Sequence, residues 1–295
     1  MQLSKRLAAV ADMVTPGFVL ADIGTDHAYI PIYLVEQQVI PRAIAADVNR
    51  GPLARANAHI RQHALAGKIE TRLSDGLAAF LPGEAQSIVI AGMGGALTVR
   101  ILANGGKNGA VLTRERQEAE ERKCQEPDGR ERREMDGQEC GTRMELILQP
   151  QSEIVLVRSW LEENGWKIVR EDMVFEDGKY YPMMKAKRCP AYSGFTQSEE
   201  QAGAYQVKKT PSSSAPSAMN ETELWFGPRL LEMRHPVLRQ FLLRERVTQE
   251  NVLKSLEQGK SEASRARERE VRRNIERINE ALRLYGENEA PGFVF

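Results

Sequence analysis

The chain has 295 residues, of which 41% are hydrophobic and 28% are charged, and its 41 Lys and Arg balance its 41 Asp and Glu. This length allows one large domain and a smaller one, and the neutral balance excludes a generally basic nucleic-acid-binding chain, so any basic surface must be local. The three cysteines form no C-x-x-C pair, no apolar segment is long enough to span a membrane, and the N-terminus has no signal-peptide core. We therefore expect a cytoplasmic protein without a metal site or a membrane anchor.

Residues 2–14 predict an amphipathic helix, because apolar side chains recur along them at helical spacing: Leu3, Leu7, Val10 and Val14. Thr15-Pro16-Gly17 ends this helix. Its polar side carries Ser4, Lys5 and Arg6, which are more typical of a solvated face than of the mouth of a ligand site.

A strand over 18–23 is predicted to pass through a tight turn at Asp22 and Gly24 into a helix over 27–38. Strand, glycine turn and helix open a nucleotide-type cofactor site in a doubly wound α/β fold. The glycine lets the backbone approach a ligand closely, and the helix N-terminus presents unpaired N–H groups. An acidic strand end suits an ammonium or a hydroxyl group better than pyrophosphate. Such a turn alone also caps ordinary βα units.

Three further strands, predicted over 43–48, 69–73 and 87–90, also end in short polar or glycine motifs. Asp47 ends the first of them, where an acidic residue typically accepts hydrogen bonds from two ribose hydroxyls. Helices are expected over 51–66 and 96–103. The motif residues after the other two strands are Asp75, Gly76, Gly92 and Met93. Ligands bind at the carboxyl ends of strands in open α/β sheets, so these motifs together predict one cofactor site.

The amino-acid composition changes at about 108–143, where Arg and Glu alternate and apolar residues are almost absent. This composition predicts a flexible insertion or a lone polar helix. A strand over 144–148, which ends on Gln149, and a helix over 152–164 follow. Two β-rich runs, 166–175 and 179–187, are joined by Asp-Gly and predict a hairpin. An antiparallel hairpin that ends a parallel sheet is typical of the methyltransferase version of this fold, and not of the dehydrogenase version.

The last third is predicted to be a Ser/Pro-rich flexible linker at 191–222 and a helical domain at 223–295. Residues 229–285 favour helix throughout, with one interruption near Gly259. Apolar side chains form two stripes: Leu238, Phe241, Leu242, Val252 and Leu256, and Val271, Ile275, Ile278 and Leu282. Two helices folded as an antiparallel coiled-coil hairpin fit this pattern. Their 14 Lys and Arg against 9 Glu suit a solvated coiled-coil face about as well as an RNA-contacting arm.

The complete prediction is an α/β, Rossmann-like class I methyltransferase domain over 1–190 with a C-terminal helical coiled-coil hairpin. The first turn lacks the G-x-G-x-x-G pattern that pyrophosphate needs, and Asp26 stands where a phosphate would bind. S-adenosylmethionine has no phosphate and carries an ammonium and a sulfonium, so acidic residues suit it. Asp75 is placed to accept from its adenine N6 amino group.

With these residues assembled, the chain resembles the bacterial tRNA (adenine-22-N1)-methyltransferases, the TrmK family. The resemblance rests on short motifs spread over most of the chain: L-S-K-R-L (3–7), A-D-I-G-T-D-H-A-Y (21–29), D-G-L (75–77), I-A-G-M-G-G (90–95), L-I-L-Q-P (146–150) and E-D-G-K-Y-Y (176–181). Gly227-Pro228 before a helical hairpin continues it. The insert at 108–143 and the stretch at 190–222 depart from the family pattern between these motifs.

The resemblance implies an enzyme that uses S-adenosylmethionine and acts on tRNA, with the coiled coil helping to hold the tRNA. We expect a monomer. It implies that eight residues surround the cofactor: Asp22, Gly24, Asp26, Asp47, Asp75, Gly76, Gly92 and Met93. Asp26 is the first candidate for catalysis, followed by His27 and Gln149. A carboxylate near N6 would stabilise the charge that develops when adenine N1 takes the methyl group, or accept the proton afterwards. A-G-M-G-G replaces the N-P-P-Y-like element that suits exocyclic amines, which favours a ring nitrogen.

Other interpretations stay open at this point. His27 could be an ordinary first-turn residue, Met93 could belong to the core, and His59, His63 and His235 show no ligand spacing and are expected at the surface. The chain could methylate another acceptor, or it could be an RNA-binding adaptor that retains a cofactor fold without turnover.

Overall fold

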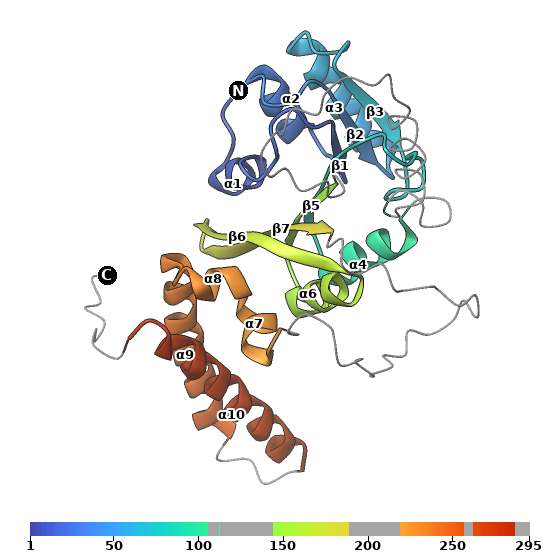
Figure 1. The fold of residues 1–295 in the computed structure, drawn as a ribbon. Coiled ribbons are helices and arrows are strands. Elements are labelled where there is room, and N and C mark those ends of the chain that lie inside the picture. Colours follow the sequence, from blue (N-terminus) through green and yellow to red (C-terminus); the bar gives the residue numbers. More distant parts are fainter. Residues whose placement is uncertain (106–111, 113–143, 189–218, 257–261, 287–295) are drawn as a thin grey trace, which may run out of the picture.

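The computed structural model describes residues 1–105, 112, 144–188, 219–256 and 262–286. The predicted insert at 108–143, apart from Leu112, and most of the predicted linker lie outside these residues. In Figure 1 a mixed sheet with helices packed around it forms one part of the molecule. A group of C-terminal helices packs beside the hairpin of β6 (Trp166–Glu176) and β7 (Lys179–Arg188). No described helix is long and apolar enough to cross a membrane.

The sheet has seven strands in the order β3-β2-β1-β4-β5-β7-β6. The parallel strands are β1 (Leu20–Ile23), β2 (Ala43–Asp47), β3 (Ile69–Leu73), β4 (Ser87–Met93) and β5 (Glu145–Pro150). The hairpin β6 (Trp166–Glu176) and β7 (Lys179–Arg188) joins β5 in antiparallel fashion. Its turn has Asp177 at φ 49° and Gly178 at φ 75°, the left-handed pair that a two-residue hairpin turn requires. The predicted fold class is confirmed.

Helices cover both faces of the sheet: α1 (Lys5–Ala11), α2 (Tyr29–Glu36), α3 (Arg50–Gln62), α4 (Gly95–Asn104) and α6 (Ile154–Glu163). Strand residues therefore point alternately into two apolar clusters. Leu146 and Leu148 belong to one cluster, whereas Ile147 between them belongs to the other. A parallel sheet buried on both faces needs such continuous apolar strands, which explains why the strands were easy to find in the sequence.

Several element boundaries differ from the expectation. α2 begins at Tyr29 because Ala28 is left-handed (φ 55°) and donates its N–H to Thr25 Oγ1 (3.2 Å). β4 and β5 run on to Met93 and Pro150, with Ala91 paired to Gln149 and a register shift at Gly92. The motif residues Gly92, Met93 and Gln149 are therefore held in the sheet and do not lie in free loops.

The C-terminal helices are α7 (Glu221–Phe226), α8 (Pro228–Glu232), α9 (Pro236–Leu256) and α10 (Glu262–Arg283). α9 and α10 form an antiparallel hairpin, because Leu238 and Leu242 near the start of α9 cluster with Ile278 and Ala281 near the end of α10. Its coiled-coil character stays a prediction. The expectation of a single interruption was wrong, since Arg234 is left-handed (φ 51°) and separates α8 from α9.

A buried ion pair joins the helical part to the sheet. Arg158 of α6 and Glu171 of β6 are 1% and 0% exposed, with Nη2 and Oε1 2.9 Å apart. Arg158 also donates to the carbonyls of Leu224 and Trp225 (2.9 and 3.0 Å). Between α7 and α8, Gly227 has φ 96°, and a Cβ there would lie 2.5 Å from Glu171 Oε2. The α7–α8 corner is therefore built around this pair.

We expect Arg158→Ala to lower the free energy of unfolding by about 3–5 kcal/mol, because it leaves the Glu171 carboxylate buried without its partner. Urea denaturation followed by circular dichroism measures this loss. Arg267→Ala removes the exposed pair with Glu270, whose side chains are 52% and 50% exposed, and should cost less than about 1 kcal/mol. Equal losses in the two variants would contradict the anchoring role of the buried pair.

Candidate cofactor and active site

The motifs that follow the parallel strands meet at one edge of the sheet. Gly24 and Thr25 both donate their N–H groups to the carbonyl of Ala46, at 2.8 and 2.9 Å, so the turn after β1 is fastened to the end of β2. Ser74 donates to the carbonyl of Asp47 (2.9 Å), which fastens the end of β3 to β2. The convergence predicted from the strand ends is therefore present, and it results from backbone pairing.

Asp22 is the most electrostatically unusual group at this edge. Its side chain lies in the sheet with the residue 7% exposed. Burial raises the pKa of Asp22 to about 6; the nearby Asp47 carboxylate acts in the same direction, and a hydrogen bond with Thr25 opposes it. Asp47 is half-buried and accepts from the N–H of Asn49 (2.7 Å). Two carboxylates that are close enough to interact favour a ligand that brings a positive charge or hydroxyl donors.

Gly24 and Met93 lie against each other across β1 and β4. Gly24 has φ 78°, and a Cβ at this position would overlap Met93 Cε. Gly92, with φ 82°, lies beside them on β4. Met93 is partly buried and packs on the core cluster of this side of the sheet, in line with the core interpretation, and its contact with a cofactor stays a prediction. The glycines leave the backbone open to close approach at this place.

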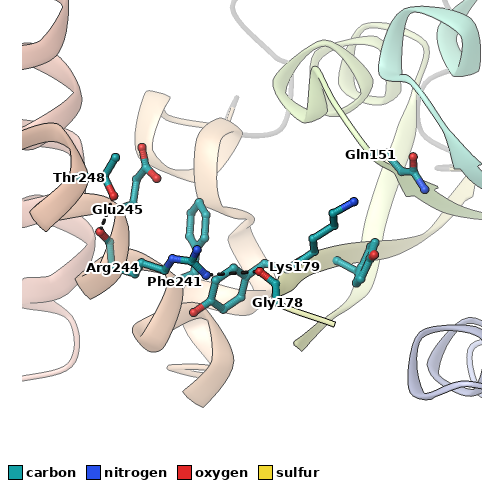
Figure 2. A pocket seen from close by; sticks show the side chains of 9 residues that line it. Gln151, Gly178, Lys179, Phe241, Arg244, Glu245 and Thr248 are labelled. Carbon is teal, nitrogen blue, oxygen red and sulfur yellow. Dashed lines mark hydrogen bonds between the residues drawn. The ribbon is translucent and has the colours of Figure 1, made fainter. Parts of the chain in front are cut away.

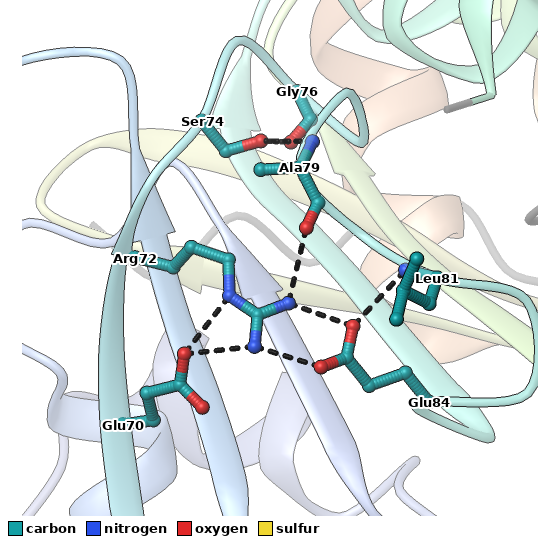
Figure 3. Close-up of polar contacts among 7 residues, drawn as sticks. All are labelled: Glu70, Arg72, Ser74, Gly76, Ala79, Leu81 and Glu84. Carbon is teal, nitrogen blue, oxygen red and sulfur yellow. Dashed lines mark hydrogen bonds and ion pairs between the residues drawn. The ribbon is translucent and has the colours of Figure 1, made fainter. Parts of the chain in front are cut away.

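The loop after β3 carries the predicted Asp75 and Gly76. Asp75 is exposed, whereas Gly76 is buried with φ 57° against Ile101 of α4, 2.9 Å from where a Cβ would stand. Ser74 Oγ donates to the carbonyl of Gly76 (2.8 Å) and accepts from the N–H of Ala79 (3.1 Å), as Figure 3 shows. The loop is thus closed on itself and leaves Asp75 at its surface.

Arg72 braces the same loop from β3 (Figure 3). It pairs with both Glu84 oxygens at 2.7 Å and donates to the carbonyl of Ala79 (3.2 Å). Glu70 Oε1 accepts from Nε of Arg72 and also from Nη2, which it shares with Glu84. The hydrogen bond from Arg72 lowers the pKa of Glu84. This network holds the Asp75 loop in place, and sequence reasoning did not identify it.

Asp26 and His27 lie together at the start of the α2 segment. The Asp26 carboxylate is 59% exposed and is held by Arg55 of α3, whose Nε donates at 2.9 Å. His27 Nε2 is 3.4 Å from Asp26 Oδ2, and its Nδ1 is buried without a hydrogen-bond partner in the part of the chain that the structure describes. The His27 ring stacks on Tyr29 at 5.0 Å and contacts His59 at 4.9 Å. His59, which we expected at the surface, is half-buried and takes part in this ring cluster.

Gln149 is fully buried at the end of β5, and its Oε1 accepts from Arg6 Nη1 at 2.8 Å. Arg6 also lies over the Tyr181 ring at 5.4 Å, and its Nη1 would be 3.7 Å from a Cβ at Gly92. Interpreting Arg6 as part of a solvated face was wrong, because α1 turns this side chain inward toward the site. The motif L-S-K-R-L, which carries part of the resemblance, was the signal that could have identified it.

The two remaining histidines each lie beside a carboxylate. His63 pairs with Glu36, and His235 Nε2 is 3.0 Å from Asp172 Oδ1. Within residues 1–105, 144–188, 219–256 and 262–286, no group of three or more His, Cys, Asp and Glu could hold a metal ion. The polar groups at the edge are carboxylates, and glycines lie between them.

A Rossmann-like sheet that ends in an antiparallel hairpin, with acidic strand ends and no phosphate loop, defines the methyltransferase class. The family model described as "Methyltransferase domain" matches residues 3–124 and 134–184, so the chain belongs to that family. The tRNA (adenine(22)-N(1))-methyltransferase of Bacillus subtilis (strain 168) is 36% identical over 199 residues, 66% of this chain and 71% of that protein. The chain is a member of the TrmK family.

Solved structures agree with this membership. The crystal structure of Bacillus subtilis TrmK has 26% identity and a TM-score of 0.68, covering 95% of this chain and 99% of that one. The Streptococcus pneumoniae protein Sp1610, solved in complex with S-adenosyl-L-methionine, has 30% identity and a TM-score of 0.67, covering 95% and 100%.

The raised pKa of Asp22 predicts a pH dependence of stability. The folded-state pKa is about 6 and the ordinary value is 3.8, so between these pH values the folded chain holds a proton that the unfolded chain releases. Raising the pH from 4 to 7 should therefore lower the free energy of unfolding of the wild type relative to Asp22→Asn, by up to about 3 kcal/mol. Urea titrations at several pH values measure the difference. Parallel curves for the two proteins would contradict the prediction.

Proposed function

We propose that the chain transfers a methyl group from S-adenosylmethionine to N1 of an adenine at position 22, in the D-arm of tRNA. The observation that carries the proposal is the edge where Asp22, Gly24, Asp47 and Asp75 come together in a chain of the TrmK family. We further propose that the enzyme acts as a cytoplasmic monomer, in keeping with a tRNA substrate.

The residues at the edge suit the parts of this cofactor. Asp47 would accept from the two ribose hydroxyls, Asp75 from the adenine N6 amino group, and Asp22 would face the ammonium of the methionine half. Gly24, Gly76, Gly92 and Met93 would let the backbone and a soft side chain approach the ligand. When bound, S-adenosylmethionine supplies an electrophilic methyl group on its sulfonium. The protein must hold the adenine N1 lone pair in line with it.

Asp26 is our candidate for handling the charge of the reaction. N1 attacks through its own lone pair and needs no prior deprotonation, but the methylated ring becomes cationic. A carboxylate close to N6 stabilises this charge or takes an N6 proton afterwards. In the structure Arg55 holds Asp26 from one side and His27 approaches it from the other. Asp26 is therefore oriented before the substrate arrives.

Gln149 is better suited to positioning than to proton transfer. Its Oε1 already accepts from Arg6, which can only donate, and its Nε2 donates to the Pro150 carbonyl at 3.4 Å, so one N–H of the amide is left for another acceptor. An NH₂ group cannot accept a proton from N6 but can donate to an acceptor on the substrate. We therefore assign Gln149, supported by Arg6, the role of placing the substrate.

The first test is reverse transcription of unmodified tRNA that was incubated with the protein and S-adenosylmethionine. A methyl group on adenine N1 blocks the pairing edge, so we expect one new stop in the D-arm, absent from a transcript with guanine at the target position. Methyl incorporation without a stop would move the acceptor elsewhere. No incorporation on any RNA would favour the adaptor and contradict the proposal.

The role of Asp26 predicts that replacing Asp26 and replacing its partner Arg55 have unequal effects on kcat. Asp26→Asn should lower kcat about 100-fold, since it removes the charge that the product ring needs. Arg55→Ala leaves that carboxylate in place and should lower kcat less than about tenfold. Single-turnover methyl transfer with saturating cofactor measures both. Equal losses would indicate that the pair matters only for structure.

A further inference from the structure

A groove of about 580 Å³ lies outside the cofactor edge, between the tip of the β6–β7 hairpin and α9 (Figure 2). Its walls come from the end of β5, from the hairpin and from one side of α9: Gln151, Gly178, Lys179, Tyr180, Tyr181, Phe241, Arg244, Glu245 and Thr248. A groove of this size is in the range of small-ligand sites.

The groove is continuous with the active site through two residues. Gln151 follows β5 directly, and its Nε2 would be 3.8 Å from a Cβ at Gly92. Tyr181 also lines the groove and carries Arg6 over its ring, and Arg6 holds Gln149. An RNA strand that leaves the active site past Gln151 would therefore enter the groove.

The side chains in the groove combine aromatic rings with a guanidinium. Tyr180 lies 5.3 Å from Phe241 in an edge-on arrangement of 70°. Arg244 lies over Tyr180 at 5.8 Å and donates to the carbonyl of Gly178 (3.3 Å), which fixes its position. Rings and guanidinium planes of this kind are the surfaces on which unpaired bases stack.

The charges in the groove suit a phosphate. Lys179 is exposed and has no hydrogen-bond or ion-pair partner among the residues that the structure describes. Arg244 has no carboxylate partner within the same part of the chain. The one acid of the groove, Glu245, accepts from Gln249 Nε2 at 2.7 Å. Two cations without carboxylate partners thus stand beside the aromatic rings.

We propose that this groove binds one unpaired nucleotide of the RNA substrate next to the methylated adenine, with its base against Tyr180 and Phe241 and its phosphate at Lys179. The inference rests on the proposed function, which requires the target adenine to leave its stack. A neighbour of a displaced base loses a stacking partner, and the groove supplies a new one.

The test combines a variant with a changed substrate. RNA affinity and methyl transfer are measured for the full chain on intact tRNA transcripts and on transcripts with an abasic site on either side of the target adenine. Tyr180→Leu should weaken binding of intact RNA about fivefold or more, as expected when stacking of one base is lost. Removing the correct flanking base should weaken the wild type equally and should leave Tyr180→Leu without further loss. Thermal melting checks that the variant is folded.

Lys179→Ala provides a second, exposed variant that leaves packing intact. It should reduce the slope of log affinity against log salt by about 0.7, the value for one phosphate contact on a single strand. Lys68→Ala is the matched control, because Lys68 is equally exposed but precedes β3 at the opposite edge of the sheet, and it should leave the slope unchanged.

Two results would overturn the inference. In the first, Tyr180→Leu binds intact RNA as tightly as the wild type does. In the second, Tyr180→Leu weakens binding of the abasic RNA by the same factor as it weakens binding of the intact RNA. If the wild type still methylates tRNA in that case, only the groove assignment fails. If the wild type neither binds nor methylates any RNA, the proposed function fails as well, and the wild-type methyl-transfer measurement separates the two cases.

Discussion

The arrangement of the two parts of this molecule depends on the buried pair of Arg158 and Glu171. Two charges removed from water are stable only if further hydrogen bonds satisfy them. Here the carbonyls of Leu224 and Trp225 accept from the guanidinium, and the N–H of Arg229 donates to the carboxylate at 2.9 Å. The groups that satisfy the pair thus belong to the backbone of the α7–α8 corner. If the helical part docked differently, the buried charges would lose these hydrogen-bond partners.

The β6–β7 hairpin connects this docking contact with the active site. At its tip, Glu176 accepts from the N–H groups of Lys5 and Arg6 at 2.7 and 3.3 Å and so fixes the start of α1. α1 in turn directs Arg6 onto Gln149. On its other side the hairpin presents Tyr180 to Phe241 of α9. One short antiparallel element therefore positions the substrate side of the active site and one wall of the groove.

The cofactor side of the site is positioned by the parallel strands and not by the hairpin. Parallel strands bring Asp22, Asp47 and the Asp75 loop to one edge. Burial of Asp22, and then the nearby Asp47 carboxylate, raise the pKa of Asp22, so its ionised form is disfavoured in the folded protein. A ligand that brings a positive charge stabilises the ionised carboxylates. The folded protein already holds these carboxylates in place, so they need not be brought together when the ligand binds. The Arg72 network fixes the loop that carries the third motif, through Glu84 and the carbonyl of Ala79.

The sequence by itself determined the alternation of strands and helices, the hairpin and the positions of the acidic strand ends. Apolar periodicity, the Asp177-Gly178 turn and the glycine motifs all act through the local backbone, and local preferences can be read from neighbouring residues. Only the tertiary structure decided that β4 and β5 extend through Gly92 and Gln149, because cross-strand pairing stabilises them there. It also placed Arg6 on Gln149, Arg55 on Asp26 and Arg158 on Glu171. These pairs join residues distant in the chain, and a long side chain on a polar helix face looks the same in sequence whether it meets water or a buried partner.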